Sequence, residues 1–390
     1  ISQSFQTLSF LFSRRLTIFL SGQRHFPTDF TDSQIYLYFC THSIKRFAID
    51  KKINRIDMTK SISIDINRID ISEDEISKLY SGLLDSLLID RTRTHYSGSA
   101  SYIVWGTNDY SYMGESYAKD KPITPNLVTG ENNGIIKPRI LKNEELRKSR
   151  TEDKAEVFTP AWVCNSQNNL LDDAWFGTEG IFNTENADKT WTSVPKGQIH
   201  IPDNYDWKQY VKLQRLEMAC GEAPYLVSRY DVTTGEIIPV QDRIGLLDRK
   251  FKLINQFTKS EPTKLNKREW RRWALRALQS VYGFDWQGDN VLLAREALLL
   301  TYIDFYVDKW GKFPLKEALE KPVEVISWNI WQMDGLQGTL PGVEGIPMLQ
   351  RMSSNQELFE DETLCLIKEW HKQEPPAGEN IRFVDLINNK

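Results

Sequence analysis

The sequence predicts an α/β fold with a mostly parallel sheet. Short apolar runs at 216–219, 280–285 and 323–329 have the length and the bounding turn residues of strands. Longer segments with a helical spacing of apolar residues separate these runs, and such alternation is typical of a parallel sheet covered by helices. A chain of 390 residues is long enough for one large domain with attachments or for two domains.

The composition is that of a folded protein. Hydrophobic residues make up 40% and charged residues 26% of the sequence, close to the averages for globular domains. The formal net charge is −4, whereas a protein that grips nucleic acid by itself usually carries a basic excess. Any contact with DNA is therefore expected to be local or shared with a partner.

The cysteines and the hydropathy pattern bear on the cellular compartment. Cys40, Cys164, Cys220 and Cys365 are far apart and form no Cys-x-x-Cys pair, so neither a zinc site nor a disulfide framework is indicated. The histidines show no ligand spacing either, and no metal is expected. Because no run approaches the roughly 20 apolar residues of a membrane span, we expect a cytoplasmic protein that does not cross a membrane.

The N-terminal part of the chain differs from the rest. Residues 1–57 show no helical or strand period and begin with Ile1. We interpret them as translated upstream sequence with Met58 as the natural start, or less readily as a leader. Residues 58–150 are then a smaller helical and loop-rich region, and residues 151–390 are the main domain.

The smaller region carries mixed local signals. A helix is expected from Ser72, because apolar residues recur there at steps of three and four. Residues 101–105 are expected to form a short strand and 114–137 a loop rich in proline and glycine. The charged run 142–154 predicts a helix exposed to solvent.

Three helices are predicted in the main domain. Thr159 is a good cap and Pro160 suits the first helical position, so 161–174 should be helical. The pattern at 266–269, Asn followed by Glu three residues later, predicts a second capped helix with one apolar face. Residues 290–306 predict a third, longer helix.

Four short segments of the main domain follow one another in a fixed order. They are 155–160 (AEVFTP), 216–226 (LEMACGEAPYL), 282–285 (YGFD) and 329–336 (NIWQMDGL). Together they resemble the amino-adenine (N6) DNA methyltransferases. A looser similarity to restriction–modification proteins called "restriction endonuclease subunit M" extends from Tyr102 to the C-terminus.

This resemblance implies a fold and a reaction. The fold is a Rossmann-like S-adenosylmethionine-dependent methyltransferase core, here incomplete, over residues 151–390. The cofactor is S-adenosylmethionine and the substrate is double-stranded DNA. The reaction is methyl transfer to the exocyclic nitrogen of adenine, which requires no metal and no covalent intermediate.

The first segment is implied to hold the methionine part of the cofactor. In the family this segment precedes the first strand, which implicates Phe158, Thr159 and Pro160. A helix N-terminus offers free backbone N–H groups to a carboxylate, and the helix dipole favours the negative charge. Taken alone, the same segment is also an ordinary capped helix start.

The second segment matches the family's glycine turn after the first strand. Gly221, preceded by Cys220, lets backbone approach the cofactor. Glu217 matches an acid that orders the loop or meets the positively charged methionine end. Ala223 and Pro224 stand where the family more often has glycine. By itself, a Cys-Gly turn also fits an ordinary strand exit.

The third segment places an acid at the end of a predicted strand. There Asp285 can accept two hydrogen bonds from ribose hydroxyls. Its alternative role is helix capping, which Asp289 and Asn290 suit better because they lie nearer the predicted helix start. Such an acid usually lies about 20 residues beyond the glycine turn. Here an insertion at 231–264 and the helix after it separate the two.

The fourth segment matches an acid that contacts the adenine ring of the cofactor. Asp334 corresponds to that acid, and Ile330 or Trp331 could pack on the ring. The alternative is a strand-to-turn Asp-Gly pair with Trp331 in the core.

The main departure from the family concerns the target base. The family holds a flipped adenine with an Asn/Asp-Pro-Pro-Tyr/Phe motif. The only Pro-Pro pair here lies in 374–377, has the wrong acid and lacks the aromatic ring, so we interpret it as a surface turn. The sequence therefore predicts that a partner chain or domain supplies the base pocket, and it assigns no catalytic residue.

The sequence is also compatible with two other functions, and it contains one basic helix surface. A non-catalytic subunit that binds the cofactor or a partner within a restriction–modification complex is the main alternative. A nicotinamide dehydrogenase is disfavoured, because residues 220–223 lack the G-x-G-x-x-G spacing. The cations from Lys267 to Arg276 could meet phosphates, but an exposed helix with a solvated basic face is the commoner explanation.

Overall fold

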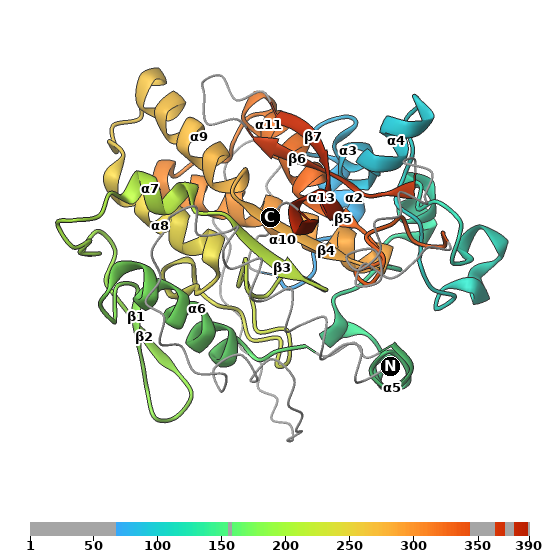
Figure 1. Cartoon of the computed structure of the whole chain (residues 1–390), viewed down its shortest axis with the longest axis horizontal. Coiled ribbons are helices and arrows are strands. Elements are labelled where there is room, and N and C mark those ends of the chain that lie inside the picture. The colour runs from blue at the N-terminus through green and yellow to red at the C-terminus, as the bar shows by residue number, and fades with distance from the viewer. Residues whose placement is uncertain (1–67, 155–157, 344–362, 371–377, 389–390) are drawn as a thin grey trace.

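The computed structural model describes residues 68–154, 158–343, 363–370 and 378–388 (Figure 1). Several predictions lie outside these ranges. They concern residues 1–57 with the start at Met58, the first three residues of the segment 155–160, and the Pro-Pro pair in 374–377.

A parallel sheet of three strands stands at the centre of the described chain. Its strands are β3 (Arg215–Met218), β4 (Val281–Asp285) and β5 (Ile330–Gln332), in the order β3-β4-β5. Both pairs are parallel, with Met218 beside Phe284 and Asp285 beside Gln332. The carboxyl ends of all three strands therefore meet at one edge of the sheet, and the predicted mixed α/β class is confirmed.

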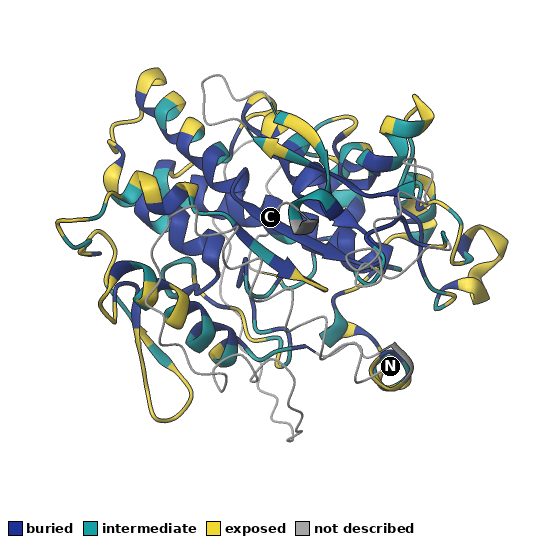
Figure 2. Ribbon diagram, in the orientation of Figure 1, coloured by how far each residue is buried: buried dark blue, intermediate teal, exposed yellow. Residues whose placement is uncertain are grey.

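Long helices accompany the sheet, and the last two along the chain contact its strands directly. They are α6 (Ala161–Phe176), α8 (Leu246–Phe257), α9 (Lys264–Leu278), α10 (Gly288–Trp310) and α11 (Lys316–Asn329). Helix α10 is buried along almost its whole length, as the dark blue ribbon in Figure 2 shows. It can be buried because nearly every face carries leucine, valine or an aromatic residue, so no polar stripe needs water.

The shorter elements lie around this centre. They are α2 (Glu73–Ser77), α3 (Leu83–Leu88), α4 (Arg91–Ser97), α5 (Glu144–Lys154), α7 (Trp207–Lys212) and α13 (Phe383–Asn388), with two antiparallel hairpins, β1 (Asn183–Glu185) with β2 (Trp191–Ser193) and β6 (Leu366–Trp370) with β7 (Gly378–Arg382). None of the helices in the described ranges combines the length and apolar character that a membrane crossing demands.

One hydrophobic core joins the smaller region to the main domain. Buried side chains of α3 belong to the same cluster as those of α9, α10 and α11. Helix α3 packs directly against α11. The boundary between residues 150 and 151 stays a prediction.

The third predicted strand was placed too early. Residues 323–329 are the second half of α11, and β5 begins only at Ile330. All of α11 from Val325 to Asn329 is buried, and a short, largely apolar run fits a strand and a buried helix equally well. The proline of this helix, Pro322, did not stop it.

Two predictions in the smaller region were only partly right. The helix expected from Ser72 is split into α2 and α3, because Gly82 takes a left-handed φ of 84° between them. The strand expected at 101–105 forms only isolated bridges, Tyr102 with Ile89 and Val104 with Pro122. The predicted loop at 114–137 is confirmed and contains only short 3-10 turns.

The helix starting after residue 142 is present as α5, but it is not wholly solvated. Arg150 is fully buried and Lys142 nearly so. Both side chains donate to the buried carboxylate of Asp289, at 2.7 and 2.8 Å. Asp289 is 139 positions from Arg150 in the sequence, so the local charge pattern did not predict this ion cluster.

Two helix caps lie a few residues from their predicted positions. The cap of α6 is Pro160 rather than Thr159, and no side chain of the cap residue bonds the helix. The cap of α9 is Thr263, whose hydroxyl accepts the Asn266 N–H at 3.2 Å. The helices themselves are confirmed, and such shifts of their ends change little else.

Candidate functional site

The turn that follows β3 is conformationally unusual. Ala219, Gly221 and Ala223 all have left-handed φ, at 49°, 53° and 60°. For an alanine this conformation costs about 1–2 kcal/mol, and such strain persists only where surrounding structure enforces it. The Cys220 N–H donates to the Phe284 carbonyl at 2.8 Å and so holds the turn against β4.

Asp285 joins this turn to the start of α10. One carboxylate oxygen accepts the Gly221 N–H at 2.9 Å, and the other accepts the Gln287 N–H at 2.9 Å. The amide of Asn290 also donates to it, at 3.4 Å. The Asp285 carboxylate therefore ties the turn after β3 to the start of α10.

Asp289 does not cap α10, contrary to the sequence expectation. It is committed to Lys142, to Arg150 and to the Tyr110 hydroxyl, which donates at 2.8 Å. Its neighbour Asn290 lies inside the helix. The N-cap of α10 is Gln287, whose side chain makes no cap bond and whose N–H donates to Asp285.

Phe158 covers the glycine of the turn. A Cβ added to Gly221 would lie 3.2 Å from two ring carbons of Phe158, so glycine is needed there for space as well as for its φ. The guanidinium of Arg139 lies 5.1 Å from the centre of the same ring. The residue after Gly221, Glu222, accepts from the Arg139 backbone N–H at 2.5 Å and from the Tyr230 hydroxyl at 2.7 Å.

The N-terminus of α6 has a carboxylate partner within the chain. The Ala161 N–H donates to Asp231 at 2.8 Å. The other oxygen of Asp231 accepts from the N–H groups of Thr233 and Thr234, at 2.7 and 3.1 Å. The expectation of free N–H groups at this helix start is therefore wrong for Ala161. Thr159 and Pro160 are half-buried beside it.

Glu217 orders the loop beyond the turn. Its buried carboxylate accepts the N–H groups of Tyr225 at 3.4 Å and Leu226 at 3.2 Å. Burial raises the pKa of Glu217 to about 8, the two N–H donors oppose that rise, and the nearby Asp285 carboxylate adds to it. The geometry thus matches the first of the two roles expected for this acid.

Asp334 lies just beyond β5 and closes its own turn. One of its oxygens accepts the N–H groups of Leu336 at 2.8 Å and Gln337 at 3.1 Å. Trp331 is buried, with its ring centre 5.5 Å from that of Phe284. These contacts match the alternative considered for this segment, an Asp-Gly turn after a strand with tryptophan in the core.

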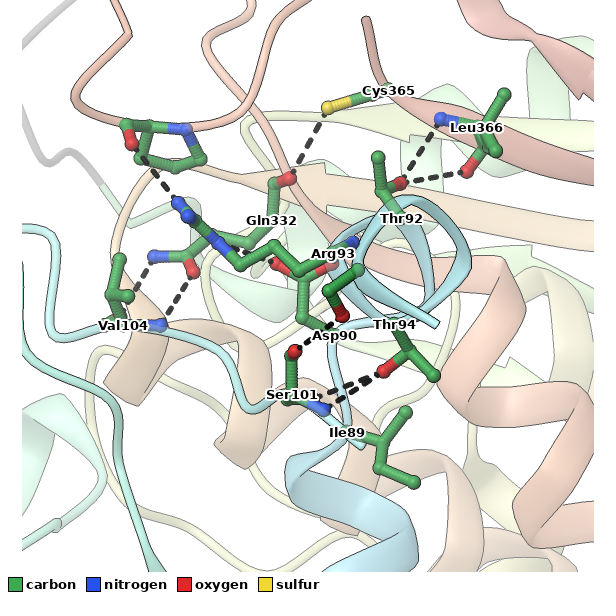
Figure 3. Close-up of polar contacts among 12 residues, drawn as sticks. Ile89, Asp90, Thr92, Arg93, Thr94, Ser101, Val104, Gln332, Cys365 and Leu366 are labelled. Carbon is green, nitrogen blue, oxygen red and sulfur yellow. Dashed lines mark hydrogen bonds and ion pairs between the residues drawn. The ribbon is translucent and has the colours of Figure 1, made fainter. Parts of the chain in front are cut away.

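Gln332 is an anchoring residue that the sequence motifs did not indicate. Figure 3 shows its side-chain amide against the backbone of Val104, where it accepts the N–H at 2.9 Å and donates to the carbonyl at 2.8 Å. It also donates to the carbonyl of Trp286 at 2.8 Å. The indole of Trp286 in turn donates to the Gly106 carbonyl at 2.8 Å. The sequence signal for this anchoring role was a polar residue at the end of a buried strand.

The four segments meet at the carboxyl edge of the sheet. Phe158 contacts Gly221, Gly221 bonds Asp285, and the Asp285 carbonyl accepts the Met333 N–H at 3.0 Å. The position of Cys220 beneath Gly283 completes the packing. The Asp334 carboxylate instead bonds within its own turn, to the N–H groups of Leu336 and Gln337.

In the part of the chain that the structure describes, His, Cys, Asp and Glu side chains form no group of three or more that could hold a metal ion. No protein-family model, curated protein sequence or solved structure is significantly similar to the chain.

Proposed function

We propose that this chain is the S-adenosylmethionine-binding part of a DNA adenine-N6 methyltransferase of a restriction–modification system. The observation that carries the proposal is the hydrogen bond from Gly221 to Asp285, 2.9 Å long, with Phe158 packed on the same turn. It connects three of the four segments that suggested the family. In open α/β sheets, ligands bind outside the carboxyl ends of the strands.

The strand order supports a nucleotide-binding role. Read from its far edge, the sheet runs β5-β4-β3. In a doubly wound dinucleotide-binding fold, the first three strands have the same order, 3-2-1, with a glycine turn after the first strand and an acid after the second. Gly221 and Asp285 occupy these two positions.

Three residues of the candidate site have specific roles in this proposal. Asp285 lies at the strand end where a carboxylate would accept hydrogen bonds from the ribose hydroxyls, and Gly221 lets the backbone of the turn approach the cofactor. Besides ordering the loop through Tyr225 and Leu226, Glu217 is proposed to meet the positively charged methionine end. The cofactor supplies an activated methyl group on a sulfonium. The protein contributes by holding the reactants in line, which alone can account for much of a rate enhancement.

The pocket for the target adenine of the DNA is proposed to come from a segment other than the four that form the candidate cofactor site. The sequence contains one Pro-Pro pair, at 375–376, flanked by Glu374 and Ala377 in place of the expected acid or amide and aromatic ring. Stacking on an aromatic ring and hydrogen bonds to the amino group hold a flipped base. A complementary segment with Asn/Asp-Pro-Pro-Tyr/Phe would supply both.

The expected outcome is a methyl-transfer activity that depends on complementation. The purified chain alone should transfer no methyl group from S-adenosylmethionine to an adenine-containing duplex. Addition of the chain or domain that carries the Asn/Asp-Pro-Pro-Tyr/Phe motif should restore transfer, measured with a labelled methyl group. A duplex containing N6-methyladenine at the target is the control. Robust methylation by this chain alone would exclude the need for a complementary segment.

Cofactor binding should depend on pH through Glu217. Because burial raises the pKa of Glu217 to about 8, much of this carboxyl is protonated at neutral pH. A positively charged ligand favours the ionised form, so binding at pH 7 should release a proton and affinity should rise as Glu217 ionises. Calorimetry in buffers of different ionisation heat measures this release.

The matched variant for this measurement is Glu217→Gln, which keeps the shape and cannot ionise. It should bind more weakly and release less proton than the original chain. The difference between the two proteins removes the contribution of the cofactor's own amine. Equal proton release by both proteins would show that Glu217 does not face the cation.

A further inference from the structure

Helices α7 and α9 carry a dense positive charge on an acidic protein. Six of the 15 residues of α9 are Lys or Arg and one is acidic, while α7 has two lysines and no acid. The chain as a whole has a net charge of −4. We call the exposed or half-exposed cations of these two helices the basic face; they are Lys208, Lys212, Lys264, Lys267, Arg268, Arg271 and Arg272.

The cations of the basic face are aligned in rows. Lys264, Arg268 and Arg272 are all exposed and lie at steps of four on α9, so they form one stripe with a spacing of about 6 Å. Lys208 and Lys212 form a second row on α7, which packs against α9. Like charges at this spacing destabilise a helix. A binding partner of opposite charge would offset that cost.

Cations of both helices pack on one shared aromatic ring. Lys208, Lys212 and Arg272 all lie over the ring of Trp273, at 5.7, 5.5 and 5.4 Å from its centre. The ring of Trp207 stacks on Phe257 beside them, with centres 5.8 Å apart. The rings hold the stems of these side chains without neutralising the charge.

Four of the exposed cations keep their charge available to a partner. Within the described ranges, Lys208, Lys212, Lys264 and Arg268 have no ion-pair partner. The indole N–H of Trp273, buried under the same cations, also has no acceptor there. The face therefore offers mainly donors and positive charge, with Glu269 as the single acid on the two helices.

The basic face is separate from the candidate cofactor site. Helix α7 leads into the amino end of β3 and α9 into the amino end of β4. The Gly221 turn and Asp285 lie at the opposite, carboxyl ends, and in Figure 1 the arrow of β3 points away from α7 and α9.

We infer that the basic face binds the phosphate backbone of double-stranded DNA. Rows of Lys and Arg match the repeated charge of a phosphate backbone, and the guanidinium fork suits phosphate oxygens. Protein–protein interfaces are instead poor in lysine. The choice of DNA rather than another nucleic acid rests on the proposed function, whereas the phosphate contact itself requires neither the cofactor nor the turn after β3.

The test is a salt titration of DNA binding without cofactor. Fluorescence anisotropy with a labelled 30-base-pair duplex gives the affinity of the full chain at several salt concentrations. Each phosphate contact contributes a slope of about −0.9 to the logarithmic salt dependence. The combined variant Lys208→Gln, Lys212→Gln, Lys264→Gln and Arg268→Gln should lower the slope by about 3–4 and weaken binding at least tenfold at low salt.

The control variant removes equal charge elsewhere. It combines Lys78→Gln, Lys119→Gln, Lys148→Gln and Lys316→Gln, all at exposed positions, and should keep most of the affinity and slope. A higher Tm of the basic-face variant is also expected, because like charges are removed. Equal losses in both variants, or an unchanged slope, would overturn the inference. Competition by polyglutamate as strong as by unlabelled duplex would assign the face to an acidic protein instead.

Discussion

Replacing Asp289 with alanine is expected to lower the free energy of unfolding by about 3–5 kcal/mol, the usual cost of removing one partner from a buried ion cluster. Asp289 is 1% exposed. Its carboxylate accepts from Lys142 at 2.8 Å and from Arg150 at 2.7 and 3.2 Å. The variant leaves both cations buried without their central counter-charge.

Denaturant unfolding measures this effect. The control is Glu324→Ala, which removes the exposed pair between Glu324 and Lys321, 2.6 Å apart. Exposed pairs contribute about 0–1 kcal/mol, so the control should change stability little. Equal losses in the two variants would show that the Asp289 cluster does not hold α5 to α10.

The same cluster makes stability depend on pH. Burial alone would raise the pKa of Asp289, but Arg150 and Lys142 together hold it far below its usual range. A carboxyl whose pKa is depressed on folding stabilises the fold at pH values above its unfolded pKa of about 3.9. This stabilisation is lost as the pH falls toward the folded pKa. The stability gap between the original chain and Asp289→Ala should therefore narrow below about pH 4.

Replacing Asp285 with alanine is expected to weaken S-adenosylmethionine binding by roughly ten- to hundredfold. Loss of a paired and desolvated acceptor costs about 1–3 kcal/mol. The variant removes acceptors for the cofactor and also the bond that positions Gly221. Asp285→Asn keeps one acceptor oxygen and should give an intermediate affinity.

The control for this series is Asp203→Ala, at an exposed position away from the sheet. It should bind the cofactor as the original chain does. Circular dichroism and thermal unfolding establish that each variant is folded. If Asp285→Ala is folded and binds the cofactor with undiminished affinity, Asp285 is a structural cap alone.

Local patterns predicted the parts of the fold that depend on local sequence. Strands β3 and β4 are apolar runs that end at a glycine turn and at an aspartate, and both were predicted. The run 323–329 was assigned to a strand, because Glu324 is its one side chain that is not buried and the run is too short to show the polar stripe that distinguishes a helix. The split at Gly82 also depends on a backbone conformation that no periodicity shows.

The candidate site was predictable only where a motif carried it. The proximity of Gly221 to Asp285 follows from two neighbouring parallel strands, each ending in a functional residue. The partners of Gln332 and Asp231 lie far away in the chain, at Val104 and Ala161. Such pairings arise from tertiary packing, and a single sequence carries no local signal for them.

Calorimetric titration of the folded chain with S-adenosylmethionine tests the central claim most directly. The account predicts saturable binding to one site per chain, weakened by Asp285→Ala and unchanged in Asp203→Ala. Absence of binding to a chain that is folded by circular dichroism and thermal unfolding would contradict the assignment of the carboxyl edge of the sheet as a cofactor site.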